Sequence, residues 1–193
     1  MNDKITLENT ILEPYENIIL DVDGVIFDCF TSAGKSIGCY MTEAPYEFLS
    51  PNIVKDIKGN IIRLQEHLRS FLEVLDDNDI NLGICSRGEK ENTPFAAQPT
   101  VMLLKKFNIY KYFTLDVVLK SGINKGDYVK AKDKTLFIDD MQDQLDSVVN
   151  NENVDTLNRK SFSDWLQLIE PKIMASLSLN ILKISAIQEL RLG

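Results

Sequence analysis

The stretch IILDVDGVIFD, from Ile18 to Asp28, decides how the rest of the sequence is interpreted. It opens with three consecutive branched apolar residues, which is typical of a strand buried on both faces. Two carboxylates, Asp21 and Asp23, follow directly and are separated by one residue. In an open α/β sheet, ligands bind beyond the carboxyl ends of the strands. The stretch therefore predicts chemistry at the end of the first strand.

Polar side chains follow two further apolar runs in the same way. One run ends in Ser86 and Arg87, and a later run ends in the adjacent carboxylates Asp139 and Asp140. Segments with helical spacing of apolar residues, such as 65–77, separate the runs. Alternating strands and helices predict an α/β fold with a central parallel sheet, in a Rossmann-like three-layer α/β/α sandwich.

The carboxyl ends of parallel strands meet at one edge of the sheet, so this fold would bring four carboxylates together. Like charges at contact range in a partly desolvated site cost several kcal/mol unless a cation balances them. Oxygen ligands without a nearby histidine or cysteine cluster favour Mg²⁺, which takes its remaining ligands from water and phosphate. The sequence predicts an anion site formed by a metal, a serine and a lysine from the loop at 120–134.

Composition limits the classes of partner. The formal net charge of -8 and a sequence pI near 4.7 argue against a nucleic-acid polymer as partner. The three cysteines show no C-x-x-C spacing, so the sequence supports neither a disulfide framework nor a zinc site. No apolar run approaches the length that spans a bilayer. We expect a soluble, cytoplasmic protein without a membrane partner.

The sequence predicts one main domain with two additions. Residues 1–170 form the core domain, and within it residues 29–60 lack a regular period and are interpreted as a flap or loop insertion over the site. Residues 171–193 carry an apolar stripe typical of an amphipathic helix, although their spacing also permits a strand. We expect this tail to dock on the core or on a second copy of the chain, as in a homodimer.

The order of the motifs resembles a known family. LDVDGV, the serine at the end of a strand, a following lysine and FIDD resemble the four motifs of the haloacid dehalogenase superfamily of aspartate-nucleophile phosphatases. CSRGEKE, the segment LLKKFNIYKYF and LFIDD are similar to the magnesium-dependent phosphatase branch of that superfamily. The resemblance covers roughly residues 16–165 and implies a phosphorylated substrate, a small flap in place of a large cap, and Mg²⁺ as cofactor.

The resemblance also implies a role for each site residue. Asp21 would attack phosphorus and form an aspartyl-phosphate. Asp23 would protonate the leaving oxygen and then activate the water that hydrolyses the intermediate. Ser86 would bind a phosphoryl oxygen, and a lysine would offset negative charge. Asp139, with Asp140, would hold Mg²⁺ together with the Asp21 carboxylate and the backbone carbonyl of Asp23.

The sequence leaves the identity of the lysine open. Lys125 best fits a motif lysine that precedes a short helix, yet it lies closer to Asp139 in the chain than is usual in the branch. Lys120, which directly follows a predicted strand, is the alternative. Both lysines and Arg87 are candidates for contacting the substrate. A further departure is Val25, where many members of the family have threonine.

Two other functions remain open beside phosphomonoester hydrolysis. The same aspartyl-phosphate could pass its phosphoryl group to an acceptor other than water, which would make the protein a phosphotransferase. A relative of such enzymes can also keep metal and phosphate affinity and serve as a non-catalytic regulatory module. The presence of Asp23 argues against this last function, because a binding module does not need a proton-transfer group. The length of the flap favours a bulky or exposed phosphorylated group.

Overall fold

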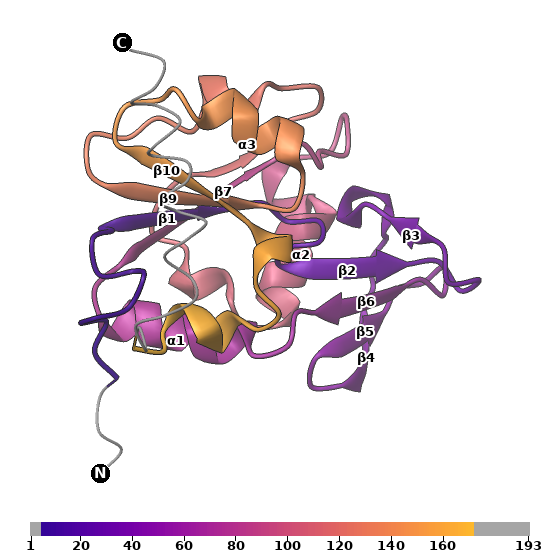
Figure 1. Cartoon of the computed structure of the whole chain (residues 1–193). Coiled ribbons are helices and arrows are strands. Elements are labelled where there is room, and N and C mark those ends of the chain that lie inside the picture. The colour runs from indigo at the N-terminus through magenta and orange to yellow at the C-terminus, as the bar shows by residue number, and fades with distance from the viewer. Residues whose placement is uncertain (1–4, 172–193) are drawn as a thin grey trace.

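Within residues 5–171, which the computed structural model describes, five parallel strands form the central sheet (Figure 1). Their order across the sheet is β10-β9-β1-β7-β8. Their bounds are β1 (Asn17–Leu20), β7 (Asn81–Ser86), β8 (Val117–Leu119), β9 (Thr135–Asp139) and β10 (Val154–Asn158). The sequence-predicted tail lies, apart from its first residue, outside the described residues.

Helices cover both faces of this sheet (Figure 1). On one face lie α1 (Leu68–Asp77) and α2 (Pro99–Lys106), and on the other lies α3 (Gln142–Val148). The strands supply apolar side chains to both sides: Leu136 belongs to the larger core cluster, whereas its neighbour Phe137 packs in a second cluster with residues of α3. The predicted three-layer α/β/α class is confirmed.

Helix α1 follows from its apolar spacing. Leu68, Phe71, Leu72 and Leu75 lie on one face and are fully buried, as expected for residues spaced three and four apart. The ring of Phe71 packs against Trp165, with 4.8 Å between the ring centroids.

A second sheet of five antiparallel strands stands beside the first (Figure 1). Its order is β3-β2-β6-β5-β4. The bounds are β2 (Phe27–Phe30), β3 (Ser36–Ile37), β4 (Glu47–Ser50), β5 (Ile53–Lys55) and β6 (Ile61–Leu64). Segment 29–60, in which the sequence indicated no regular element, therefore contains the end of β2 and all of β3, β4 and β5. Strands of two to four residues are too short to show a clear alternation of apolar and polar residues.

Six single-turn 3-10 helices complete the described chain: η1 (Cys39–Met41), η2 (Phe95–Ala97), η3 (Tyr110–Tyr112), η4 (Lys125–Asp127), η5 (Arg159–Ser161) and η6 (Trp165–Leu168). The last, η6, is four residues long. Its start is fixed by Asp164, whose carboxylate accepts a hydrogen bond from the backbone N–H of Leu166. No helix among residues 5–171 combines the length and the apolar character needed to cross a membrane.

We expect Phe71→Ala to lower the free energy of unfolding by about 3–5 kcal/mol, because it opens a cavity against Trp165. Phe95→Ala is the matched control, since Phe95 is 47% exposed and an exposed substitution changes stability by about 0.5 kcal/mol or less. Urea unfolding of both variants measures the difference. Equal losses would contradict the assignment of Phe71 to the core.

Candidate active site

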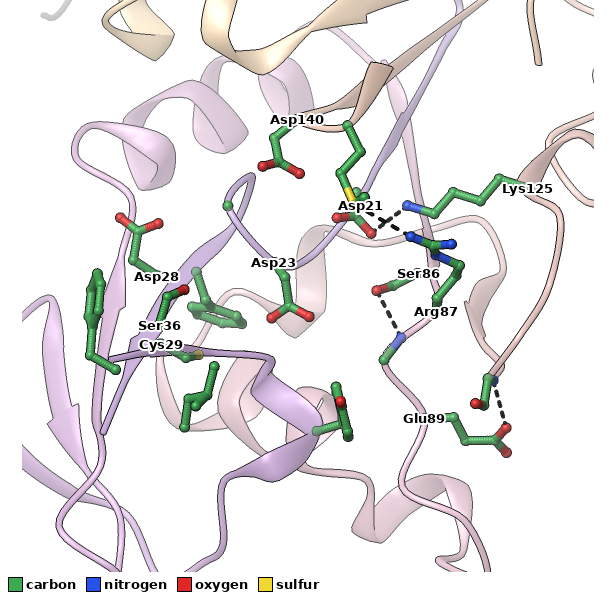
Figure 2. Close-up of a pocket in the computed structure, with 18 of the residues that line it drawn as sticks. Asp21, Asp23, Asp28, Cys29, Ser36, Ser86, Arg87, Glu89, Lys125 and Asp140 are labelled. Carbon is green, nitrogen blue, oxygen red and sulfur yellow. Dashed lines mark hydrogen bonds and ion pairs between the residues drawn. The ribbon is translucent and has the colours of Figure 1, made fainter. Parts of the chain in front are cut away.

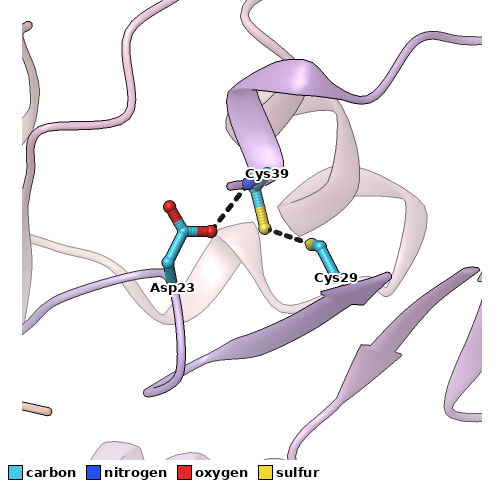
Figure 3. Close-up of side chains that lie close together, drawn as sticks. All are labelled: Asp23, Cys29 and Cys39. Atoms are coloured by element: carbon cyan, nitrogen blue, oxygen red, sulfur yellow. Dashed lines mark hydrogen bonds between the residues drawn. The ribbon is translucent and has the colours of Figure 1, made fainter. Parts of the chain in front are cut away.

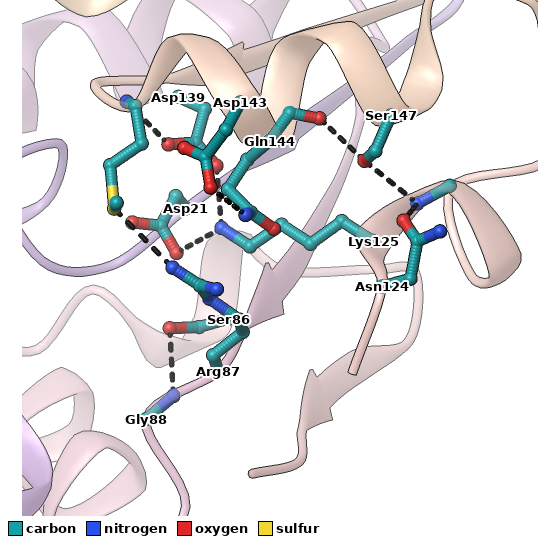
Figure 4. Close-up of polar contacts among 12 residues, drawn as sticks. Asp21, Ser86, Arg87, Gly88, Asn124, Lys125, Asp139, Asp143, Gln144 and Ser147 are labelled. Atoms are coloured by element: carbon teal, nitrogen blue, oxygen red, sulfur yellow. Dashed lines mark hydrogen bonds and ion pairs between the residues drawn. The ribbon is translucent and has the colours of Figure 1, made fainter. Parts of the chain in front are cut away.

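The register of the central sheet brings the predicted residues together. Leu20 at the end of β1 pairs with Ile84 of β7 on one side and with Ile138 of β9 on the other. Asp21 and Asp139 each follow this level by one residue. The side chain of Ser86, two residues beyond it on β7, joins them at the same edge of the sheet (Figure 4).

Lys125 occupies the centre of this edge. Its Nζ lies 2.6 Å from Asp21 Oδ1 and 2.5 Å from Asp139 Oδ2 (Figure 4). All three side chains are buried, and Lys125 itself is only 2% exposed. Burial by itself would lower the pKa of Lys125, but the negative charges of Asp21 and Asp139 raise the pKa overall. The lysine therefore stays charged between the two carboxylates.

Asp21 has a perturbed pKa. Burial raises the pKa of its carboxyl to about 6 from an ordinary value of 3.8. The positive charge of Lys125 opposes this increase, and the nearby carboxylate of Asp139 adds to it. The positive charge of Lys125 therefore does not fully compensate for the burial of Asp21, and the ionised form of Asp21 stays destabilised.

The turn that carries Lys125 is anchored to α3. The backbone N–H of Gly126 contacts the side-chain oxygens of Asn124, at 3.1 Å, and Ser147, at 3.2 Å. The amide of Asn151 donates to the carbonyl of Gly126 at 2.8 Å. A Cβ atom at position 126 would lie 2.0 Å from the carbonyl oxygen of Ser147, so only glycine allows this packing. These contacts determine where the Lys125 side chain begins.

The other two basic candidates, Lys120 and Arg87, make different contacts. The Nζ of Lys120 donates to the Tyr128 hydroxyl at 3.1 Å and is exposed. Among the described residues, the pocket lining includes Lys125 and Arg87 but not Lys120. Arg87 extends along the rim, where its Nη2 lies 3.5 Å from Met141 Sδ. The structure therefore brings Lys125, rather than Lys120, into contact with the acidic residues.

Asp140 completes a group of three carboxylates. Asp21, Asp139 and Asp140 each offer an oxygen within 4.8 Å of the others. Gly24 makes this approach feasible, because a Cβ atom there would lie 2.9 Å from Asp140 Oδ2. The exposed side of Asp140 is paired with Lys160, at 3.2 Å.

This group fits a hard divalent cation. The donors are all carboxylate oxygens, the ligand type that Mg²⁺ prefers. Three carboxylates outnumber the two ammonium groups that contact them, Lys125 and the exposed Lys160, so the group keeps a net negative charge that favours a cation. The side chains of Asp21, Asp139 and Asp140 would hold the ion. The Asp23 carboxylate belongs to a different group, with Cys29 and Cys39.

Asp23 is held by the second sheet and the turn beyond it. The backbone N–H of Cys39 donates to Asp23 Oδ1 at 2.7 Å, and the Cys39 sulfur lies 2.7 Å from that of Cys29 (Figure 3). Burial raises the pKa of Asp23, and the hydrogen bond from Cys39 partly offsets this effect. Burial and the neighbouring Cys29 also raise the pKa of the Cys39 thiol, so the Cys39 sulfur stays protonated and neutral. Asp21 and Asp23 thus stand in different environments.

The acidic edge opens into a pocket of about 650 Å³ between the two sheets (Figure 2). Its walls come from the ends of the parallel strands, the turn around η4 and the second sheet. Ser86 lies inside it and accepts a hydrogen bond from the backbone N–H of Gly88 at 3.3 Å. The charged and polar lining residues include Asp21, Asp23, Asp28, Ser86, Arg87, Glu89, Lys125 and Asp140, and the apolar ones include Phe27, Phe30, Ile37, Tyr40 and Met141.

Sequence reasoning missed the part of the pocket built by the second sheet. The N–H of Cys39 and the ring of Tyr40 belong to a segment without a periodic pattern, so the sequence carried no signal for their position. Gly88 could have been noticed, because a glycine two residues after a strand-terminal serine leaves room for a ligand beside it.

No family model matches the sequence, and no curated protein matches it. A solved structure described as a "Putative Phosphatase from Clostridium difficile" is 16% identical, with a TM-score of 0.47 over 75% of this chain and 84% of that chain. The fission yeast RNA polymerase II CTD phosphatase Fcp1, as a variant bound to beryllium fluoride, is 15% identical, with a TM-score of 0.42. That match covers 93% of this chain and 52% of that chain. The function of this chain is therefore argued from its own side chains.

We expect Asp21→Asn to stabilise the metal-free protein at pH 7.5 by about 1–3 kcal/mol. The folded-state pKa of Asp21 lies near 6, above its ordinary value of 3.8. Its ionisation therefore destabilises the fold above about pH 6, and this penalty disappears as the pH falls towards 4. Urea unfolding at pH 7.5 and pH 5 measures the effect. A variant less stable than the wild type at pH 7.5 would contradict this account.

We expect Lys125→Met to lower the free energy of unfolding by about 3–5 kcal/mol in metal-free buffer at pH 7.5, because it leaves two buried carboxylates without their ammonium. Lys120→Met serves as the control and should change stability by about 0.5 kcal/mol or less, since Lys120 is exposed. Thermal or urea unfolding compares the two. Similar effects of both substitutions would show that the contacts of Lys125 contribute little.

Proposed function

We propose that the protein is a Mg²⁺-dependent phosphatase that hydrolyses a phosphomonoester through an aspartyl-phosphate on Asp21. The observation that carries the proposal is the separation of two neighbouring carboxylates into different environments. Asp21 contacts the Lys125 ammonium and belongs to the group of carboxylates that fits a dication. Asp23 instead accepts a backbone N–H and has a pKa raised by burial. Neighbouring acids with different environments are typical of a nucleophile and a proton donor.

Each residue then has a chemical task. The Asp21 carboxylate attacks phosphorus, and the bond to the leaving oxygen breaks as Asp23 gives that oxygen its proton. Asp23, now ionised, takes a proton from the water that attacks the aspartyl-phosphate and releases inorganic phosphate. Ser86 and Lys125, together with Arg87 on the rim, are side-chain donors in the pocket lining that are available to the phosphoryl oxygens. Bound Mg²⁺ would supply positive charge that offsets the charge of the carboxylates and the phosphoryl group.

Two alternative outcomes concern the same site. A phosphotransferase would use the same aspartyl-phosphate with a hydroxyl acceptor in place of water. A binding module would keep the metal and phosphate contacts without turnover. The position of Asp23 inside the pocket favours catalysis over binding alone, because a carboxylate beside a bound phosphate would otherwise only repel it.

Release of inorganic phosphate from p-nitrophenyl phosphate, with and without Mg²⁺, tests the proposal. We expect activity that requires Mg²⁺, a loss of more than about 10³-fold in Asp21→Asn, and a loss of about 10²–10⁴-fold in Asp23→Asn. Asp77→Asn, on the exposed side of α1, is the control and should keep wild-type activity.

The alternatives give distinct results. Consumption of substrate that exceeds phosphate release when an alcohol is present would identify a phosphotransferase. An inactive wild type that still binds Mg²⁺ and inorganic phosphate would identify a binding module. Full activity in Asp21→Asn would rule out Asp21 as the nucleophile.

A further inference from the structure

The part of the pocket beside Asp23 is bounded by a serine, a tyrosine and a glycine. A carbon atom at the Cβ position of Gly88 would lie 3.5 Å from Asp23 Oδ2, 3.5 Å from Ser86 Oγ and 3.6 Å from Tyr40 Cδ1. One point in the pocket is therefore within contact distance of a carboxylate, a hydroxyl and an aromatic ring. Because position 88 has no side chain, the space next to this point, beyond van der Waals contact with the Gly88 backbone, is open to a ligand.

A second glycine, Gly38, leaves room for the ring of Tyr40 at this point. A Cβ atom at Gly38 would lie 2.4 Å from Tyr40 Cε1 and 3.2 Å from Asp23 Oδ2. Any other residue at position 38 would force the ring away from its place beside Asp23. Tyr40 lines the pocket and is 41% exposed, so part of its surface is available for a ligand.

The surface next to Tyr40 continues as an apolar wall. Phe30 of β2 and Ile37 of β3 line the same pocket and are partly buried. On the opposite rim, the Glu89 carboxylate already accepts the backbone N–H of Ser121 at 3.1 Å. The volume of about 650 Å³ falls within the range of pockets that enclose a whole organic ligand. The pocket thus offers room and apolar surface beyond the phosphate position.

We propose that Tyr40 determines specificity at this site, and that the substrate is a phosphomonoester whose organic group presents a flat, apolar face next to the phosphate. This inference rests on the proposed function. If Ser86 binds a phosphoryl oxygen and Asp23 protonates the leaving oxygen, that oxygen lies near the point that both share with the Tyr40 ring. The first atoms of the organic group then lie against the ring. An aromatic group would gain a stacking contact there, and a short alkyl group would not.

Benzyl phosphate and ethyl phosphate test the inference, because their leaving alkoxides are similar in basicity and differ mainly in the ring. The wild type, Tyr40→Phe and Tyr40→Ala are compared by kcat/KM on both substrates. Phe95→Ala is the matched control, since Phe95 is an aromatic residue of similar exposure outside the pocket lining.

We expect the wild type to prefer benzyl phosphate, and Tyr40→Ala to lower that preference about 3–10-fold, mainly through KM. Tyr40→Phe and Phe95→Ala should keep the preference. Equal losses on both substrates in Tyr40→Ala would overturn the inference, because Tyr40 would then act only on the general geometry of the site. An unchanged preference in Tyr40→Ala would overturn it as well.

Failure of the proposed function is distinguished by a binding measurement. If the wild type hydrolyses neither substrate, the proposed phosphatase activity fails, and the inference is judged by calorimetry with benzylphosphonate and ethylphosphonate in the presence of Mg²⁺. Tighter binding of benzylphosphonate that Tyr40→Ala removes would support a flat apolar ligand. Equal affinities, or no binding of either compound, would overturn it.

Discussion

The contact of the Lys125 ammonium with Asp21 and Asp139 is the interaction on which the rest of the site depends. Strands β1 and β9 are paired in register up to Leu20 and Ile138, so the acidic residues that follow these positions lie side by side. This holds whether or not their negative charges are balanced. The buried Lys125 ammonium stabilises the two neighbouring carboxylates only when its own position is fixed. That position comes from the packing of Gly126 against α3, where no side chain larger than hydrogen fits.

The contact of Lys125 with Asp21 and Asp139 does not balance all the negative charge of the site. The buried Lys125 ammonium and the exposed Lys160 ammonium face three carboxylates, and burial holds the pKa of Asp21 near 6. The ionised Asp21 is therefore a cost in stability that the core must offset. The large apolar cluster that includes Phe71 and Trp165 supplies that stability. Accumulation of unbalanced acids over a well-packed core is typical of a site that binds a cation and an anion together.

The sequence predicted the central sheet and most of the acidic edge, because long apolar runs identify buried strands and parallel strands align their carboxyl ends. It favoured Lys125 over Lys120 but did not settle the choice, since the position of Lys125 depends on the contact of Gly126 with Ser147, two residues that are distant in the chain. The second sheet was missed because its strands are short. The partner of Asp23, the N–H of Cys39, was missed for the same reason.

The two sheets contribute different side chains to the lining of the pocket. The parallel sheet carries charge: its strand ends and the η4 turn supply the carboxylates, the serine hydroxyl and the ammonium, which suit a phosphate and a cation whatever organic group is attached. The antiparallel sheet and η1 supply the apolar side chains of Phe30, Ile37 and Tyr40, together with one carboxylate, Asp28 of β2. Asp23 is the one carboxylate held from both sides, because its backbone follows β1 and its side chain is fixed by Cys39. In the proposed mechanism, a change in the second sheet would act on Asp23 as well as on the organic group of the ligand, so selectivity and turnover would be coupled through Asp23.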